Sequence, residues 1–163
     1  MKATSLPARL VAAVALALAA LTVGADDTPS AAPAAAARNS LAAARSAIAT
    51  ADWRAALAEL RRVDDPASAD WNNLMGYVLR KASPPDYAAA ERHYDAALRI
   101  QPNHRDALEY SGELYLMTGR LAEAERRLAA LDRACRLPCE QYTDLKQAVA
   151  KYKAGQGAAG AAR

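Results

Sequence analysis

The sequence predicts an all-α fold in which paired helices stack as a short solenoid. First, Ala56, Ala90 and Ala124 recur at a constant interval of 34 residues, and a period of this length is typical of repeats built from two helices. Second, apolar residues between positions 40 and 152 recur at spacings of three and four, as they do on one face of an amphipathic helix. An unrelated helical bundle would show the short period without the long one, so a repeat architecture is favoured.

The long period extends to other positions of the chain. Three more sets of residues keep the same interval: Trp53, Tyr87 and Leu121; Leu60, Tyr94 and Leu128; and Val63, Ala97 and Leu131. All of them lie in the predicted second helix of a hairpin. The first helices are less regular, because Ala44 and Gly76 are 32 residues apart whereas Gly76 and Gly112 are 36 apart.

The helices can be placed in order from this pattern. We expect three hairpins, with helices at 40–50 and 53–63, at 70–81 and 87–100, and at 105–118 and 121–135, followed by a closing helix at 140–152. Residues with short polar side chains precede several of these helices and can accept hydrogen bonds from free backbone N–H groups: Asn39, Asp52, Ser68, Asp86 and Asn103. Pro66, Pro102 and Pro138 fall in the connections between hairpins, where proline is tolerated.

On these residues the chain resembles the tetratricopeptide repeat family. The resemblance implies a right-handed solenoid of about three repeats, near 39–68, 69–102 and 103–137, within one domain at 39–153. The first repeat matches the family pattern less well than the second and third. Small residues would let helices approach, and aromatic and leucine residues would fill the space between hairpins. The residues expected to pack the repeats are Ala56, Leu60, Gly76, Ala90, Tyr94, Ala97, Gly112, Tyr115, Ala124 and Leu128.

The two ends of the chain are expected to lie outside the repeats. Residues 1–25 begin with the basic residues Lys2 and Arg9, continue with an apolar run and end in small residues at Ala25. This is the pattern of a secretory signal peptide with its cleavage site after Ala25. The apolar run is short for a membrane anchor, which needs about 20 residues. We therefore expect export, to the periplasm if the source is a Gram-negative bacterium. Residues 26–38 and 154–163 are rich in Ala with Pro or Gly, and both are expected to be flexible or disordered.

Charge and motifs narrow the classes of function. The chain has a net charge of +3, and removal of Lys2 and Arg9 with the signal would lower it by two, to +1. A nucleic-acid binder normally carries a basic stripe or a strongly basic domain, so that class is disfavoured. The sequence shows no motif that pairs a catalytic nucleophile with a general base and no glycine-rich loop of the kind that binds phosphate. Its Cys and His residues do not have the spacing of metal ligands. We expect neither an enzyme nor a bound cofactor or metal.

The resemblance implies that a partner protein segment binds in a groove lined by the first helix of each hairpin. Polar, aromatic and apolar residues spaced by three and four share one face of these helices, and a peptide would lie there as an extended chain or a helix. The alternative is that they are solvated residues, some paired as Arg80 with Glu113 or Lys81 with Glu109, which would contribute little. The candidate groove residues are Asp70, Asn73, Tyr77, Arg80, Lys81, Asp106, Glu109, Glu113, Leu116 and Met117. Trp71 faces either the neighbouring hairpin or the groove.

Cys135 and Cys139 are the two cysteines of the chain. In an oxidising compartment such a pair is expected to form a disulfide, which would tie the sixth helix to the closing helix. The favoured function is a protein-interaction module in an envelope assembly. The alternative is a thiol-redox or cofactor-delivery accessory protein that acts through these cysteines. A further alternative is that the partner is a second copy of the chain, bound through the outer face of the first hairpin.

Overall fold

The structure, a computed structural model, describes residues 40–161. Within this range it contains seven helices and no strand. The helices are α2 (Ala42–Ala49), α3 (Trp53–Val63), α4 (Ala69–Lys81), α5 (Tyr87–Ile100), α6 (Arg105–Met117), α7 (Leu121–Ala134) and α8 (Glu140–Ala161). The first six agree with the predicted helices to within two residues at each end. The predicted signal peptide at 1–25 and the Ala/Pro-rich segment at 26–38 lie outside the described residues.

Side-chain caps start four of the helices. Asp52, Ser68 and Asp86 each accept a hydrogen bond from the backbone N–H three residues later, which satisfies one of the free donors at a helix start. At α6 the capping residue is His104 rather than the expected Asn103, and the imidazole Nδ1 accepts from the Ala107 N–H at 3.2 Å. An imidazole nitrogen can replace a side-chain oxygen here because it is an acceptor when its ring is neutral.

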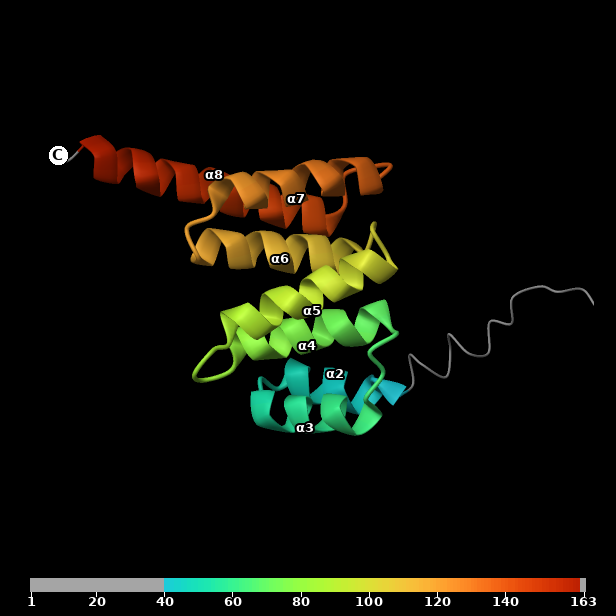
Figure 1. The fold of residues 1–163 in the computed structure, drawn as a ribbon. Coiled ribbons are helices and arrows are strands. Elements are labelled where there is room, and N and C mark those ends of the chain that lie inside the picture. Colours follow the sequence, from blue (N-terminus) through green and yellow to red (C-terminus); the bar gives the residue numbers. More distant parts are fainter. Residues whose placement is uncertain (1–39, 162–163) are drawn as a thin grey trace, which may run out of the picture. The chain divides into compact units, whose positions relative to one another are not determined.

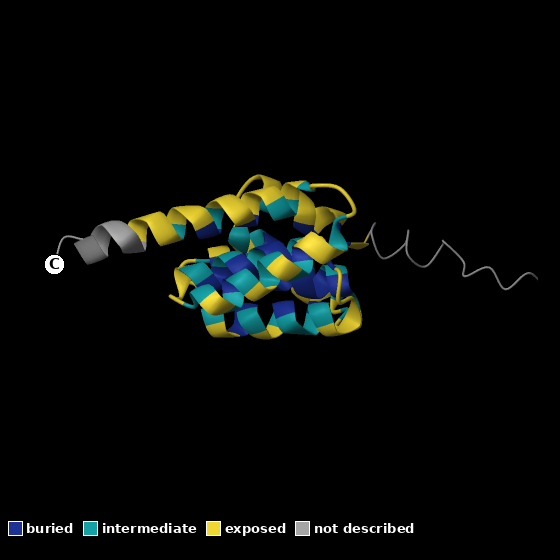
Figure 2. Ribbon diagram, turned by 90° about the horizontal axis from the view of Figure 1, so that it is seen from above, coloured by how far each residue is buried: buried dark blue, intermediate teal, exposed yellow. Residues whose placement is uncertain are grey.

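The helices form consecutive antiparallel hairpins that stack on one another (Figure 1). Each second helix packs against the first helix of the next hairpin, so that α3 contacts α4 and α5 contacts α6. Three clusters of buried apolar residues follow the stack, one around α2–α4, one between α5 and α6, and one among α6–α8. Buried residues accordingly face the inside of the stack and exposed residues face outward (Figure 2). Each hairpin therefore buries its apolar surface against its neighbours, as repeat proteins do.

Two glycines permit close helix contacts. A Cβ atom added at Gly76 would lie 2.7 Å from a ring carbon of Tyr94, and one added at Gly112 would lie 2.5 Å from a methyl carbon of Leu145. Both distances are below van der Waals contact. Gly76 thus accommodates an aromatic ring of its own hairpin, and Gly112 accommodates a side chain of α8. Apart from Leu128, which is half-buried, the residues expected to pack the repeats are all buried.

Helix α8 occupies the position of the first helix of a further repeat. It packs on α6 and α7 in the way that α6 packs on α4 and α5. It also runs to Ala161, nine residues beyond the predicted end at Tyr152. The prediction of a disordered tail is therefore wrong for residues 154–161. Segment 154–161 contains four alanines and no proline, and alanine is the strongest helix former. None of the helices in residues 40–161 has the length and apolar character needed to cross a membrane.

Candidate functional site

The predicted groove residues separate into three groups along the first helices. Those near the helix starts link neighbouring repeats, those in the middle are largely buried between helices, and those near the helix ends surround an open pocket. The three groups lie along α4 and α6, and the last group lines an open pocket.

At the helix starts, Asp70 and Asp106 connect successive repeats. Asp70 of α4 accepts hydrogen bonds from Arg45 of α2 and from His104 before α6, both at 3.0 Å. Because the Nδ1 atom of His104 accepts from a backbone N–H, its Nε2 atom carries the proton and donates to Asp70. Asp106 accepts from the Gln141 amide of α8 at 2.9 Å. These two aspartates hold the helices together at this end.

In the middle of the helices, Tyr77 is part of an aromatic row. Its ring lies 6.0 Å from that of Trp53 and 4.8 Å from that of Tyr110, measured between centroids. Asn73 is buried, and its amide oxygen has no hydrogen-bond partner among the described residues. Asn73 is thus buried between helices, whereas the rings of the aromatic row are half-buried.

Glu109 is a buried carboxyl on the same face. It is 8% exposed. Burial raises its pKa to about 8, and the nearby carboxylates of Glu113, Asp144 and Asp106 add to the increase. The Glu109 side chain is thus protonated at neutral pH and adds little negative charge to the groove.

At the helix ends, Arg80 is a buried cation that joins two repeats. It is 4% exposed, and its Nη1 atom lies 2.6 Å from Glu113 Oε2 of α6. The guanidinium carbon is 5.5 Å from the ring centroids of both Tyr77 and Tyr110, within the range of a cation–π interaction. Of the two pairings considered from the sequence, Arg80 with Glu113 is present. Lys81 instead lies over the Tyr77 ring, 5.7 Å from its centroid.

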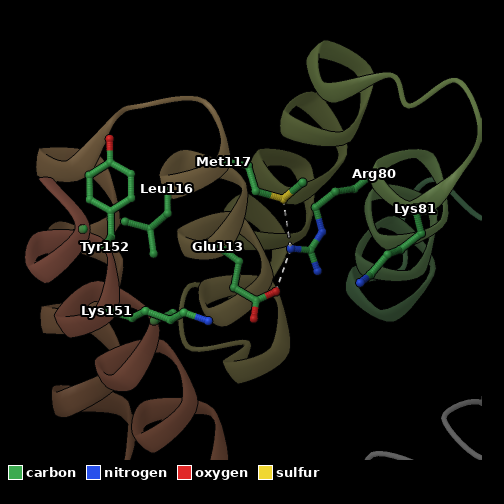
Figure 3. A pocket seen from close by; sticks show the side chains of 9 residues that line it. Arg80, Lys81, Glu113, Leu116, Met117, Lys151 and Tyr152 are labelled. Carbon is green, nitrogen blue, oxygen red and sulfur yellow. Dashed lines mark hydrogen bonds and ion pairs between the residues drawn. The ribbon is translucent and has the colours of Figure 1, made fainter. Parts of the chain in front are cut away.

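An open pocket of about 700 Å³ adjoins these helix ends. Five of the predicted groove residues line it, all of them from the last turns of α4 and α6: Arg80, Lys81, Glu113, Leu116 and Met117. The opposite wall comes from α8, which contributes Ala148, Lys151, Tyr152 and Gly155. In Figure 3, Lys81 and Lys151 extend toward the pocket from opposite sides. The volume is in the range of pockets that bind small ligands or peptide side chains.

The α8 wall is the part of the site that the sequence reasoning missed. The closing helix was expected only to cover the last hairpin, and its extension past Tyr152 was not foreseen. A signal was available in the sequence, since Leu145, Ala148 and Tyr152 share one helical face at spacings of three and four.

Other candidate residues have clear positions. Trp71 faces the neighbouring hairpin and not the groove, because its indole N–H donates to the Leu60 carbonyl at 2.8 Å and the side chain is buried. Cys135 and Cys139 are joined at the connection between α7 and α8. In the range 40–161 no cluster of three or more His, Cys, Asp or Glu side chains is placed to hold a metal ion.

The hairpin of α6 and α7, the interval of 34 residues from Ala90 to Ala124 and the close contact at Gly112 lie in the segment that a family comparison recognises. A model of the tetratricopeptide repeat family matches residues 85–149, which span α5, α6, α7 and the first half of α8. The match supports tetratricopeptide repeats in this part of the chain. No match is found among curated proteins.

The tetratricopeptide repeat match includes part of α8. The structure gives the reason, because α8 packs on the last hairpin as the first helix of a further repeat would. The pocket therefore lies on the face formed by first helices, where α4, α6 and α8 follow one another. Tetratricopeptide repeats generally mediate contacts between proteins and act as non-catalytic scaffolds.

Proposed function

We propose that the chain is an exported protein-interaction module that binds a segment of a partner protein in the pocket between α4, α6 and α8. The observation that carries the proposal is the apolar surface left open there. Met117 is 54% exposed and lines the pocket together with Leu116 and Ala148. Apolar side chains in a concave site are suited to receive an apolar side chain of a partner, and a few such anchors dominate the energy of an interface.

The proposal includes export and a partner in an envelope assembly. It is supported by the signal-like sequence at 1–25 and by the joined cysteines, because disulfides persist mainly in oxidising compartments. Detection of the chain with its N-terminus at Asp26 in the exported fraction of the source cells would support this part. A chain that keeps residues 1–25 and remains in the cytosol would contradict it.

Capture from extracts of the source cells tests the binding role. The immobilised chain is compared with two charge-introducing variants, Met117→Glu in the pocket and Leu137→Glu as a control on the exposed α7–α8 connection. We expect a partner that is retained by the unmodified chain and by the control but lost with Met117→Glu. Equal retention by the Met117 variant would exclude the pocket as the binding site.

A further inference from the structure

The pocket has an excess of positive charge that its own residues do not neutralise. Arg80, Lys81 and Lys151 line it together with a single carboxylate, Glu113, and the Oε2 atom of Glu113 is paired with Arg80. Among the described residues, neither Lys81 nor Lys151 forms an ion pair. A ligand that brought carboxylates to these ammonium groups would complete pairs that the folded chain leaves open.

Arg80 adds a second, independent indication. Its side chain is almost completely buried, and its Nη1 atom donates to Glu113 and contacts the Met117 sulfur. The Nη2 atom makes no hydrogen bond to any described residue, and the buried Nε atom also has no partner. Nη2 is thus an unused donor of a fixed guanidinium that lines the pocket, and a charge-assisted hydrogen bond to a carboxylate is the strongest interaction it can make.

The pocket also has an apolar lining, to which Leu116 and Met117 of α6 and Ala148 of α8 contribute. Lys81 and Lys151 lie on opposite sides of it, and the carboxylate of Glu113, which is paired with Arg80, lies between them (Figure 3). The two lysines approach from opposite walls, so acidic groups on both sides of an apolar residue match the arrangement better than one terminal carboxylate does.

We propose that the occupant of the pocket is an internal acidic segment of the partner protein, with Asp or Glu side chains on both sides of an apolar residue. The apolar residue contacts Leu116, Met117 and Ala148, and the carboxylates pair with Lys81, Lys151 and the unused donor of Arg80. This inference rests on the proposed function, since it names the chemistry of the segment that the pocket binds. Electrostatic complementarity of this kind selects partners and accelerates their association.

Selection from a random dodecapeptide library displayed on phage tests the proposal. Enriched sequences are synthesised with acetylated N-termini and amidated C-termini, so that they carry no terminal charge, and their binding to the full chain is measured by fluorescence anisotropy. We expect enriched peptides that contain acidic residues on both sides of Leu, Ile, Met or Phe. Replacement of their acidic residues by Gln or Asn should weaken binding about tenfold or more, and raising the salt concentration should weaken it as screening increases.

Matched lysine variants locate the effect. Lys81→Glu and Lys151→Glu should each weaken binding about tenfold, whereas Lys146→Glu should not, because Lys146 is an exposed lysine of α8 outside the pocket, over the Tyr142 ring. All variants should keep the helical circular dichroism of the unmodified chain.

The other outcomes separate the two proposals. Neutral peptides that still depend on Met117 would overturn the acidic segment and leave the pocket as a binding site. The same would follow if binding required a free terminal carboxylate. Binding peptides that respond to no pocket variant, or a selection without any binder, would overturn both proposals. A peptide of residues 26–38, which contains Asp26 and Asp27, serves as a competitor. If it competes with the same affinity as the enriched peptides, the occupant of the pocket is the chain's own N-terminal segment and not a partner protein.

Discussion

Arg80 and Glu113 form an ion pair that is buried on one side only. The pair joins α4 to α6 at 2.6 Å, and the Arg80 side chain is 3% exposed whereas that of Glu113 is 33% exposed. Removal of Glu113 would leave an unpaired guanidinium that is largely shielded from water. Removal of Arg80 would leave a carboxylate that water can still solvate. The pair stabilises the second and third repeats against each other at the edge of the pocket, and its two members should respond differently to substitution.

Glu113→Gln is therefore expected to lower the free energy of unfolding by about 1.5–3 kcal/mol, the usual contribution of a hydrogen bond to a charged group. Arg80→Met, which retains a long apolar side chain, should cost less, because no buried charge is left unpaired. The double variant should be no less stable than Glu113→Gln alone. Urea unfolding of the three variants measures these differences. A larger loss for Arg80→Met than for Glu113→Gln would contradict the asymmetry.

The stability of the fold should decrease between about pH 5 and pH 8 because of Glu109. Burial raises the pKa of Glu109 to about 8 in the folded chain, above its value in the unfolded chain. The folded state thus binds the proton more tightly, and the stabilisation is complete at low pH and lost as the pH rises through the folded pKa. Glu109→Gln should be more stable than the unmodified chain at pH 8 and show a flatter pH profile. Thermal unfolding measured over this pH range checks the prediction, with Glu140→Gln as a control at an exposed position. If stability depended on pH in the same way in both variants, the role of Glu109 would be contradicted.

Gly112→Ala should loosen the contact of α8 with α6. The added methyl group would meet the side chain of Leu145, and overpacking of this kind costs about 1–3 kcal/mol. Gly155→Ala in α8 provides the matched control, because the added Cβ there would meet no atom within 4 Å beyond its own helix backbone and chain neighbours. That change should stabilise the protein by up to about 1 kcal/mol through helix propensity. Melting temperatures of both variants test the contact, and a Gly112→Ala variant as stable as the control would refute it.

The cysteine pair should resist reduction if its role is structural. Its removal by Cys135→Ser with Cys139→Ser is expected to cost about 2 kcal/mol, the chain-entropy contribution for so short a loop. Thiol titration of the protein purified from its own compartment should find essentially no free thiol. A readily reducible pair, with a potential near those of thiol-exchange catalysts, would instead favour the thiol-redox or cofactor-delivery alternative.

The sequence predicted the hairpins well because their signals are local. Spacings of three and four set the helix faces, Asp52, Ser68 and Asp86 cap helix starts, and the interval of 34 residues aligns the second helices. The extension of α8 was missed because Gly155, Gly157 and Gly160 suggested a disordered tail.

The groove was predicted less completely, since spacing identifies a face of a helix but not what covers that face. Asn73, Glu109 and Met117 are all predicted to lie on the groove-facing side of their helices. Asn73 and Glu109 are buried between packed helices, whereas Met117 is exposed. Only the arrangement of α4, α6 and α8 in space distinguishes them. The electrostatic state of Glu109 also depends on Asp144 of α8, a neighbour that the periodicity of α6 does not reveal.

Site-specific photo-crosslinking in the source cells tests the central claim most directly. A photoreactive amino acid replaces Met117 in the pocket, Leu137 on the α7–α8 connection or Ile100 at the end of α5, all three of which are exposed. The account predicts that a partner protein is crosslinked from position 117 and not from positions 100 or 137. Crosslinks to a partner from positions 100 or 137, with none from position 117, would contradict it.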